Sequence, residues 1–302
     1  MTEKNRLGDV QEHEEYLEAK DGTQVFMRSW LPQQEIEHIV FAAHGGSSHS
    51  GMYRRIALAL CERNIATFGI DLRGFGHSGT PGDVEDFAVV FEDIAMALSA
   101  VRARYPDLPV SMLGMSMGVA TVINALDQYE LNPSTVILLA GHIGGTVSAR
   151  QMLKSMAFLV KSFFLRNTML DTVSMWSKEE LELEAYQLLL KDELCTKRFS
   201  RRYILGQIPF MNVKRLWEAA TKISVPTLII HGEGDSANPP DSSRHLYEKL
   251  TVPQKKLVMI PDMDHDLDGL ISYMGPGLHK PLAPDASRVV EEIVAWLQAD
   301  HA

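Results

Sequence analysis

Short apolar runs alternate with amphipathic stretches along most of the chain. The apolar runs lie at residues 24–30, 38–43, 66–70, 110–113, 135–139, 227–230 and 257–260. Helical spacing of apolar residues occurs near 52–62, 87–104, 117–128, 241–250 and 286–298. Runs without polar alternation are typical of strands buried on both faces, so the pattern predicts an α/β fold with a mostly parallel central sheet and helices on both faces. The run at 24–30 follows a turn signal, Asp21-Gly22, and is expected to belong to a hairpin.

The alternation is interrupted between residues 142 and 210. Apolar side chains recur at helical spacing from Met152 to Phe164, and further helices are expected near 178–190 and 195–205. We therefore predict a core of residues 15–141 and 211–302, with a helical lid inserted at 142–210. Open α/β sheets bind ligands at the C-terminal ends of their strands, so the lid is expected over that edge. Residues 1–14 are polar and acidic and are predicted to be a loose tail.

Composition and charge argue against several classes of protein. The 302 residues carry a formal net charge of −10, which disfavours nucleic acid as a partner and strong attraction to an anionic membrane. The N-terminus has no apolar core and no run is long enough to span a bilayer, so we expect a cytoplasmic protein, peripheral to a membrane at most. Cys61 and Cys195 predict buried thiols in a reducing compartment. The sequence does not indicate the oligomeric state.

Residues 114–118 (GMSMG) join a predicted buried strand to a predicted helix. The G-x-S-x-G pattern is weak by itself, but a tight strand-to-helix turn strains the backbone of its serine and exposes the hydroxyl above the sheet. Strand and helix nearly touch at such a turn, which explains the small residues Gly114 and Gly118. The N-terminus of the helix also favours developing negative charge. We predict that Ser116 is a nucleophile.

A serine nucleophile needs a base, and in hydrolases with this turn the chain order is serine, acid, histidine. Asp235 follows the run at 227–230, and His265 follows the run at 257–260. Parallel strands end at one edge of the sheet, so both side chains are expected near Ser116. His265 would take the serine proton and Asp235 would orient the imidazole. Glu233 is an alternative carboxylate, closer to the strand end, and His231 is expected to be structural.

Residues 44–46 (HGG) follow the run at 38–43 and suggest an oxyanion hole. Such a site needs two N–H donors aimed at the developing charge, and we expect them from Met117 and Gly46. The alternative is a simple glycine turn. Asp262 and Asp264 flank the histidine and offer metal ligands, but no second cluster of histidine or cysteine ligands is present, so we predict neither a metal nor another cofactor.

Several stretches resemble the monoacylglycerol lipase and lysophospholipase branch of the α/β-hydrolase superfamily, from about residue 20 to the C-terminus. They are residues 44–53 (HGGSSHSGMY), 71–79 (DLRGFGHSG), 86–87 (DF) with Asp93, 105–109 (YPDLP) and 113–118 (LGMSMG). The resemblance implies the α/β-hydrolase fold, with residues 142–210 as the lid. The chain departs from the family where Met115 replaces the usual histidine, Val119 the usual glycine and Met52 the usual arginine. These departures leave the triad intact, and Met115 and Met52 are expected to reshape the pocket near the acyl carbonyl.

The resemblance implies a serine hydrolase that cleaves carboxylic esters through an acyl-enzyme, with a monoacylglycerol lipase releasing fatty acid and glycerol as the leading hypothesis. Lysophospholipase, thioesterase and general carboxylesterase activities are alternatives, as is a ligand-binding receptor that retains the triad. The expected partner is an acyl ester or lipid. The substrate-binding residues that we predict are Met115, Met152, Met156, Phe158 and Phe163. The apolar stripe of the lid is compatible with an acyl-chain tunnel and transient contact with a lipid surface, or with packing on the core alone.

Overall fold

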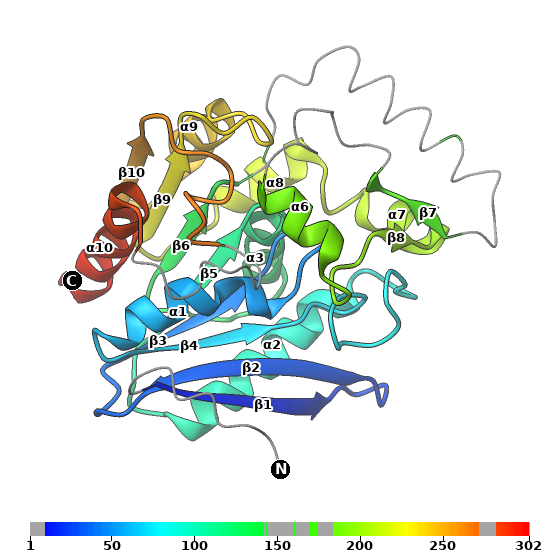
Figure 1. Ribbon diagram of the computed structural model, residues 1–302, viewed down its shortest axis with the longest axis horizontal. Coiled ribbons are helices and arrows are strands. Elements are labelled where there is room, and N and C mark those ends of the chain that lie inside the picture. Colours follow the sequence, from blue (N-terminus) through cyan, green and yellow to red (C-terminus); the bar gives the residue numbers. More distant parts are fainter. Residues whose placement is uncertain are drawn as a thin grey trace.

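The computed structural model describes residues 10–141, 143, 160, 169–173, 184–271 and 282–301. Its centre is an eight-stranded sheet with the order β1-β2-β4-β3-β5-β6-β9-β10 (Figure 1). The strands are β1 (Val10–Glu18), β2 (Gln24–Pro32), β3 (His38–Ala43), β4 (Ile65–Ile70), β5 (Val110–Met115), β6 (Val136–Leu139), β9 (Thr227–Gly232) and β10 (Lys255–Ile260). The pairs β1–β2 and β2–β4 are antiparallel, and the remaining pairs are parallel. The mostly parallel sheet predicted from the apolar runs is confirmed.

The N-terminal hairpin begins earlier than the sequence predicts. Residues 10–14, expected to belong to a loose tail, pair with β2 from Val10 onward. Gly22 makes the turn with φ +81°, a left-handed conformation that glycine adopts without strain. β1 is an edge strand with mostly exposed side chains, so its sequence shows no apolar alternation. Ion pairs of Glu12 with Arg28 and Arg54 instead fasten it to the neighbouring elements.

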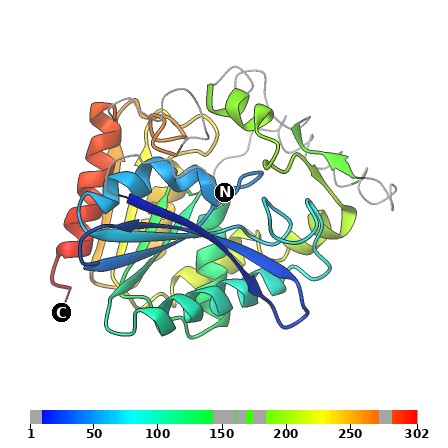
Figure 2. The same cartoon turned by 60° about the horizontal axis from the view of Figure 1, so that its bottom comes forward.

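Helices cover both faces of the sheet, as predicted, because alternate strand residues contribute to two hydrophobic clusters. In β3, Phe41 belongs to one cluster and Val40 to the other. One face carries α2 (Val89–Arg104), α3 (Met117–Gln128), α8 (Val213–Ala220) and α9 (Asp241–Lys249), and the other carries α1 (Arg54–Cys61) and α10 (Pro284–Gln298). Figure 2 shows α1 and α2 on opposite sides of the sheet. Each fully buried aliphatic or phenylalanine side chain contributes roughly 1.5–3 kcal/mol, which holds these layers together.

The insertion lies between two strands that are direct neighbours. The chain leaves the sheet after β6 and re-enters it in β9, which pairs with β6 in parallel. The described elements between them are β7 (Leu170–Asp171), α6 (Glu184–Lys191), β8 (Arg198–Phe199), α7 (Arg201–Gln207) and α8. The helix expected at 195–205 begins later, where the side chain of Ser200 caps it by accepting from the N–H of Tyr203. Among the described residues, no helix combines the length and apolarity needed to cross a membrane.

The described part of the insertion packs against the loop that follows β4. The rings of Phe199 and Tyr203 lie 5.6 and 5.7 Å from the ring of Phe75. The N–H of Ser200 donates to the carbonyl of Gly82 at 2.7 Å. α6, α7 and the β7–β8 pair therefore lie on one side of the molecule, beside the C-terminal ends of β3 and β4 (Figure 1). The predicted lid residues Met152, Met156, Phe158 and Phe163 lie outside the described residues.

Candidate active site

Three side chains from separate loops meet at the C-terminal edge of the sheet. Ser116 follows β5, Asp235 follows β9 and His265 follows β10. His265 Nε2 lies 3.2 Å from Ser116 Oγ, and His265 Nδ1 lies 2.7 Å from Asp235 Oδ2. The structure thus brings together the predicted nucleophile, base and acid in one hydrogen-bonded line. In this line Nδ1–H donates to the carboxylate, and Nε2 is free to accept the serine proton.

The backbone of Ser116 is strained, as the sequence predicts. Its φ of +54° and ψ of −117° place it outside the regions that residues other than glycine ordinarily adopt. The two flanking glycines explain how the turn closes. A Cβ on Gly114 would lie 2.4 Å from the carbonyl oxygen of Gly118, and one on Gly118 would lie 2.1 Å from that of Ala43. Strand β3, strand β5 and helix α3 therefore pack backbone to backbone below the serine.

Asp235 is buried and satisfied by four donors. Its Oδ1 accepts from the N–H groups of Ala237 and Asn238 at 2.9 and 2.7 Å. Its Oδ2 accepts from His265 and also from His231 Nε2 at 3.0 Å. Burial alone would raise the pKa of Asp235, but the hydrogen bonds from His231 and His265 outweigh it and hold the pKa well below its usual value. The carboxylate therefore stays charged at neutral pH.

His231, expected to be structural, contacts Asp235 as a second histidine beside His265. It is fully buried, and its Nδ1 lies 2.6 Å from Ser243 Oγ. Its Nε2 faces two acceptors, Asp235 Oδ2 and the carbonyl of Asn238, so the proton resides on Nε2. Ser243 then donates to Nδ1. The histidine–glycine pair at the end of the strand gave no indication of this contact, because it depends on how the following turn folds back.

Sequence reasoning did not identify Asn238, which lies beside the nucleophile. Its Nδ2 is 3.2 Å from Ser116 Oγ and 2.9 Å from the carbonyl oxygen of Ala140. The residue is 8% exposed. Nothing in the local sequence indicates these two contacts, because Ser116 and Ala140 come from the ends of β5 and β6.

The predicted oxyanion residues lie next to each other. A Cβ on Gly46 would be 3.8 Å from Met117 Sδ. Met117 is the first residue of α3, so its backbone N–H has no intrahelical acceptor. His44 holds the loop in place: its Nδ1–H donates to the carbonyl of Gly45 at 2.7 Å, and its Nε2 accepts from Leu72 N–H at 2.9 Å. Burial lowers the pKa of His44 to about 4, so the ring is neutral and can serve as this acceptor.

Residues 71–79, quoted above for the family resemblance, organise the loops around the site. Asp71 is fully buried, and its two oxygens accept from Ser50 N–H at 2.6 Å and His77 N–H at 2.9 Å. Arg73 donates twice to Asp93, at 2.8 and 2.7 Å, which ties this loop to α2. Asp71 therefore fixes backbone positions in two loops, and Arg73 fixes the loop after β4 to a helix.

Two further predicted positions differ in their surroundings. Met115 is 2% exposed and packs in the same buried cluster as Met52, so its role in substrate binding stays a prediction. Glu233, the alternative acid, is 43% exposed and pairs with Arg244 at 2.6 Å. Because Asp235 contacts His265 and Glu233 faces an arginine instead, the geometry favours Asp235 as the acid.

One group of potential metal ligands comes together within the described ranges. The ligand atoms of His49, Asp192 and Cys195 all lie within 4.8 Å of one another. However, His49 Nδ1 accepts from Gly51 N–H at 3.1 Å, which places the ring proton on Nε2, facing Asp192 Oδ2 at 3.0 Å. A nitrogen that donates to a carboxylate has no lone pair for a metal. We interpret the His49–Asp192 contact as a tether between the insertion and the loop after β3.

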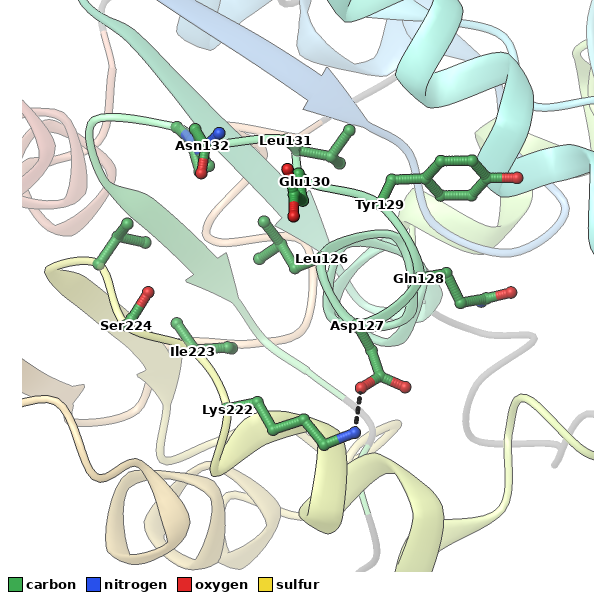
Figure 3. Close-up of a pocket in the computed structure, with 12 residues that line it drawn as sticks. Leu126, Asp127, Gln128, Tyr129, Glu130, Leu131, Asn132, Lys222, Ile223 and Ser224 are labelled. Atoms are coloured by element: carbon green, nitrogen blue, oxygen red, sulfur yellow. Dashed lines mark hydrogen bonds and ion pairs between the residues drawn. The ribbon is translucent and has the colours of Figure 1, made fainter.

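A cavity of about 260 Å³ lies at the far end of α3 from the nucleophile (Figure 3). It is lined by residues 126–133 and 222–225, and Lys222 pairs with Asp127 at 2.6 Å. Ser116 precedes the first residue of α3 and the cavity begins at its last turn, so the length of the helix, roughly 18 Å, separates them. This cavity does not belong to the triad site.

Comparisons with known proteins agree with this geometry. The family model Hydrolase_4, described as serine aminopeptidase, S33, matches residues 34–269. Monoglyceride lipase of Rattus norvegicus is 28% identical over 286 residues, covering 93% of this chain and 89% of that protein. Caffeoylshikimate esterase of Arabidopsis thaliana is 28% identical over 271 residues, covering 85% of this chain and 80% of that protein.

The solved structures include a soluble variant of monoglyceride lipase from Saccharomyces cerevisiae in complex with a substrate analogue. Its TM-score is 0.74 at 20% identity, and the alignment covers 94% of each chain. At this identity the likeness concerns the fold. Together with the sheet described above, it confirms the predicted α/β-hydrolase fold.

Proposed function

The chain belongs to the Hydrolase_4 (serine aminopeptidase, S33) family of α/β-hydrolases, and we propose that it cleaves carboxylic esters through an acyl-enzyme, with monoacylglycerols as its principal substrates. One observation carries the proposal. Ser116 has the strained backbone of a nucleophile and lies 3.2 Å from His265 Nε2, while the same imidazole donates to a buried carboxylate. Aspartate at the elbow would instead suit dehalogenase or epoxide hydrolase chemistry.

In acylation, Ser116 Oγ attacks the carbonyl carbon of the ester as His265 Nε2 takes the hydroxyl proton. The carbonyl electron pair moves to the oxygen, and the N–H groups of Gly46 and Met117 are the proposed donors to that oxyanion. Asp235 stabilises the imidazolium. Its pKa is held low, so it is a charged carboxylate when the positive charge forms on His265. The intermediate collapses, and the imidazolium gives its proton to the departing alcohol. Water activated by the same histidine then releases the acid.

The choice of monoacylglycerols rests on relatives. Proteins named monoglyceride lipase from rat and human are 28% and 27% identical to this chain over 93% of its length. The caffeoylshikimate esterase named above is a relative of similar identity, which keeps general carboxylesterase activity as the second candidate. Both activities share the acyl-enzyme chemistry and differ in the acid and alcohol that the enzyme accepts.

The test is a substrate panel assayed with purified protein and with Ser116→Ala as the matched control. The panel contains 4-nitrophenyl esters of rising chain length, monoacylglycerols, lysophosphatidylcholine, an acyl-CoA thioester and leucine 4-nitroanilide. We expect monoacylglycerols to turn over fastest and the alanine variant to lose about 10⁴-fold or more in kcat. If only the short 4-nitrophenyl esters turned over, the enzyme would be assigned as a general carboxylesterase. Turnover of the anilide alone, or ligand binding with no Ser116-dependent turnover, would refute the proposal.

A further inference from the structure

The side chain of Asn238 is held in one orientation beside the nucleophile. Its backbone N–H donates to Asp235 Oδ1 at 2.7 Å, and its carbonyl accepts from His231 Nε2 at 3.1 Å. Its Nδ2 contacts two oxygens, Ser116 Oγ at 3.2 Å and Ala140 O at 2.9 Å. If the amide were turned the other way, Oδ1 would face the Ala140 carbonyl oxygen, and two acceptors would repel each other. The carbonyl therefore fixes the amide with Nδ2 toward the serine.

The number of protons on the amide nitrogen matters. Nδ2 carries two hydrogens, so one can bind Ala140 while the other is presented to Ser116 Oγ. A serine, threonine or cysteine at this position has a single hydrogen for two acceptors, and an aliphatic residue has none. Ser116 Oγ meanwhile donates its own proton to His265 and accepts from Asn238. The nucleophilic oxygen thus has one acceptor and one donor at fixed positions.

We propose that Asn238 is a further catalytic residue, which assists departure of Ser116 Oγ when the acyl-enzyme breaks down. The inference rests on the ester-hydrolase function proposed above. In that step, His265 takes a proton from water and the hydroxide adds to the acyl carbonyl carbon. The bond from that carbon to Oγ then breaks, its electron pair goes to Oγ, and the imidazolium returns the proton to Oγ. Asn238 donates to Oγ while this negative charge develops.

Oγ gains negative charge in both steps, but the effect is larger on deacylation because the strength of the hydrogen bond changes more between the starting state and the transition state. In the free enzyme Oγ is a hydroxyl oxygen that already accepts from Asn238, so acylation starts with the bond made. In the acyl-enzyme Oγ is an ester oxygen, a poorer acceptor. As the bond to carbon breaks, Oγ becomes alkoxide-like and the hydrogen bond strengthens. An interaction stronger in the transition state than in the preceding state accelerates that step.

The test compares Asn238→Leu with Ser242→Ala as the matched control. Ser242 is 1% exposed and donates to the carbonyl of Gly141 at 2.6 Å, a similar buried bond to the end of β6 that does not involve Ser116. Stopped-flow kinetics with a 4-nitrophenyl ester separates the acylation burst from steady-state turnover, and intact mass measures acyl-enzyme. For Asn238→Leu we expect deacylation to fall about tenfold, acylation to change less than about threefold, and acyl-enzyme to accumulate. The control should keep the wild-type ratio of the two rates.

The inference would be overturned if Asn238→Leu left the ratio of the deacylation rate to the acylation rate unchanged, whether because both rates fell equally or because neither changed. If Asn238→Leu does not fold, the same two rates are measured for Asn238→Ser. Its single short hydroxyl cannot donate to both Ser116 Oγ and the Ala140 carbonyl, so deacylation should again fall more than acylation. Failure of the proposed function is a different result: the wild-type protein would then show no Ser116-dependent ester hydrolysis. An active wild-type enzyme with an unchanged ratio in the variant refutes only the role of Asn238.

Discussion

Replacing Gly118 by alanine tests whether the nucleophile elbow is rigidly packed. The added Cβ would lie 2.1 Å from the carbonyl oxygen of Ala43 and 2.8 Å from that of His44, whereas ordinary contact begins at 3.4 Å. Both neighbours are backbone atoms at the end of β3, where the loop carrying Gly46 begins. To fit the methyl group, helix α3 and this strand end must separate by roughly 1.3 Å, which is the difference between the 3.4 Å of ordinary contact and the 2.1 Å to Ala43. The proposed oxyanion donors, the N–H groups of Gly46 and Met117, would then move relative to Ser116.

A misplacement of about 1 Å in a catalytic site can cost about 10²-fold in rate, and overpacking costs roughly 1–3 kcal/mol of stability. We therefore expect Gly118→Ala to lower kcat/KM for a short 4-nitrophenyl ester by about 100-fold, with a reduced melting temperature. Circular dichroism and thermal unfolding establish that the variant is folded at the assay temperature.

Gly22→Ala is the matched control, because its Cβ would meet no atom within 4 Å and its cost comes from φ +81° alone. We expect a loss of roughly 1–2 kcal/mol and an unchanged kcat/KM. If folded Gly118→Ala kept kcat/KM within about threefold of the wild type, the packed elbow would not be what positions the donors, and the reasoning would be refuted.

Three further substitutions test other parts of the structure. Burial, and then Asp264, raise the pKa of Asp266 to about 8, so the folded protein keeps a proton that the unfolded chain releases near pH 4. Asp266→Asn should therefore stabilise the protein by an amount that is absent below about pH 4 and grows up to about pH 8; a pH-independent difference in urea unfolding would contradict this. Asp93→Leu removes the buried partner of the Arg73 guanidinium, which keeps only its contacts with Asp21 and Thr23, and should cost about 1.5–3 kcal/mol, much of it recovered by adding Arg73→Met; a single-variant loss under about 1 kcal/mol in denaturant titrations would disprove it. Gly206→Ala in α7 places a Cβ 3.5 Å from its nearest neighbour and should add roughly 0.5–1 kcal/mol, measured as a higher Tm; a lower Tm would count against it.

Most of the parallel part of the sheet was predictable because every residue of β3, β4, β5, β6 and β9 is buried. The apolar runs match β3 at both ends and the other parallel strands to within two residues. The start of β1 was missed because an edge strand needs no apolar face, and its first residues are mostly exposed and polar. α8 has eight residues, and so short an amphipathic segment differs little from a loop in sequence.

The meeting of Ser116, Asp235 and His265 was predictable for a topological reason. Each residue lies at the end of a parallel strand or in the loop that follows it, and parallel strands end at a common edge. The surroundings of the acid were not predictable in the same way. Asn238 contacts Ser116 because the turn after Asp235 folds back onto the end of β6, and the direction of a side chain within a turn is set by tertiary contacts. Pattern and spacing place residues at an edge of the sheet but do not orient them.

The position of the insertion between neighbouring strands bears on how such an enzyme can change over evolutionary time. Since β6 and β9 are hydrogen-bonded partners, their register is set within the sheet, and the described part of the connection between them contributes no strand to it. Each doubling of a flexible connection costs only about 0.6 kcal/mol of closure entropy. Changes in the length of this connection therefore leave the pairing of β6 with β9 in place. The edge of the sheet that carries Ser116, Asp235 and His265 can therefore be inherited unchanged while the length of this connection varies among descendants of one chain.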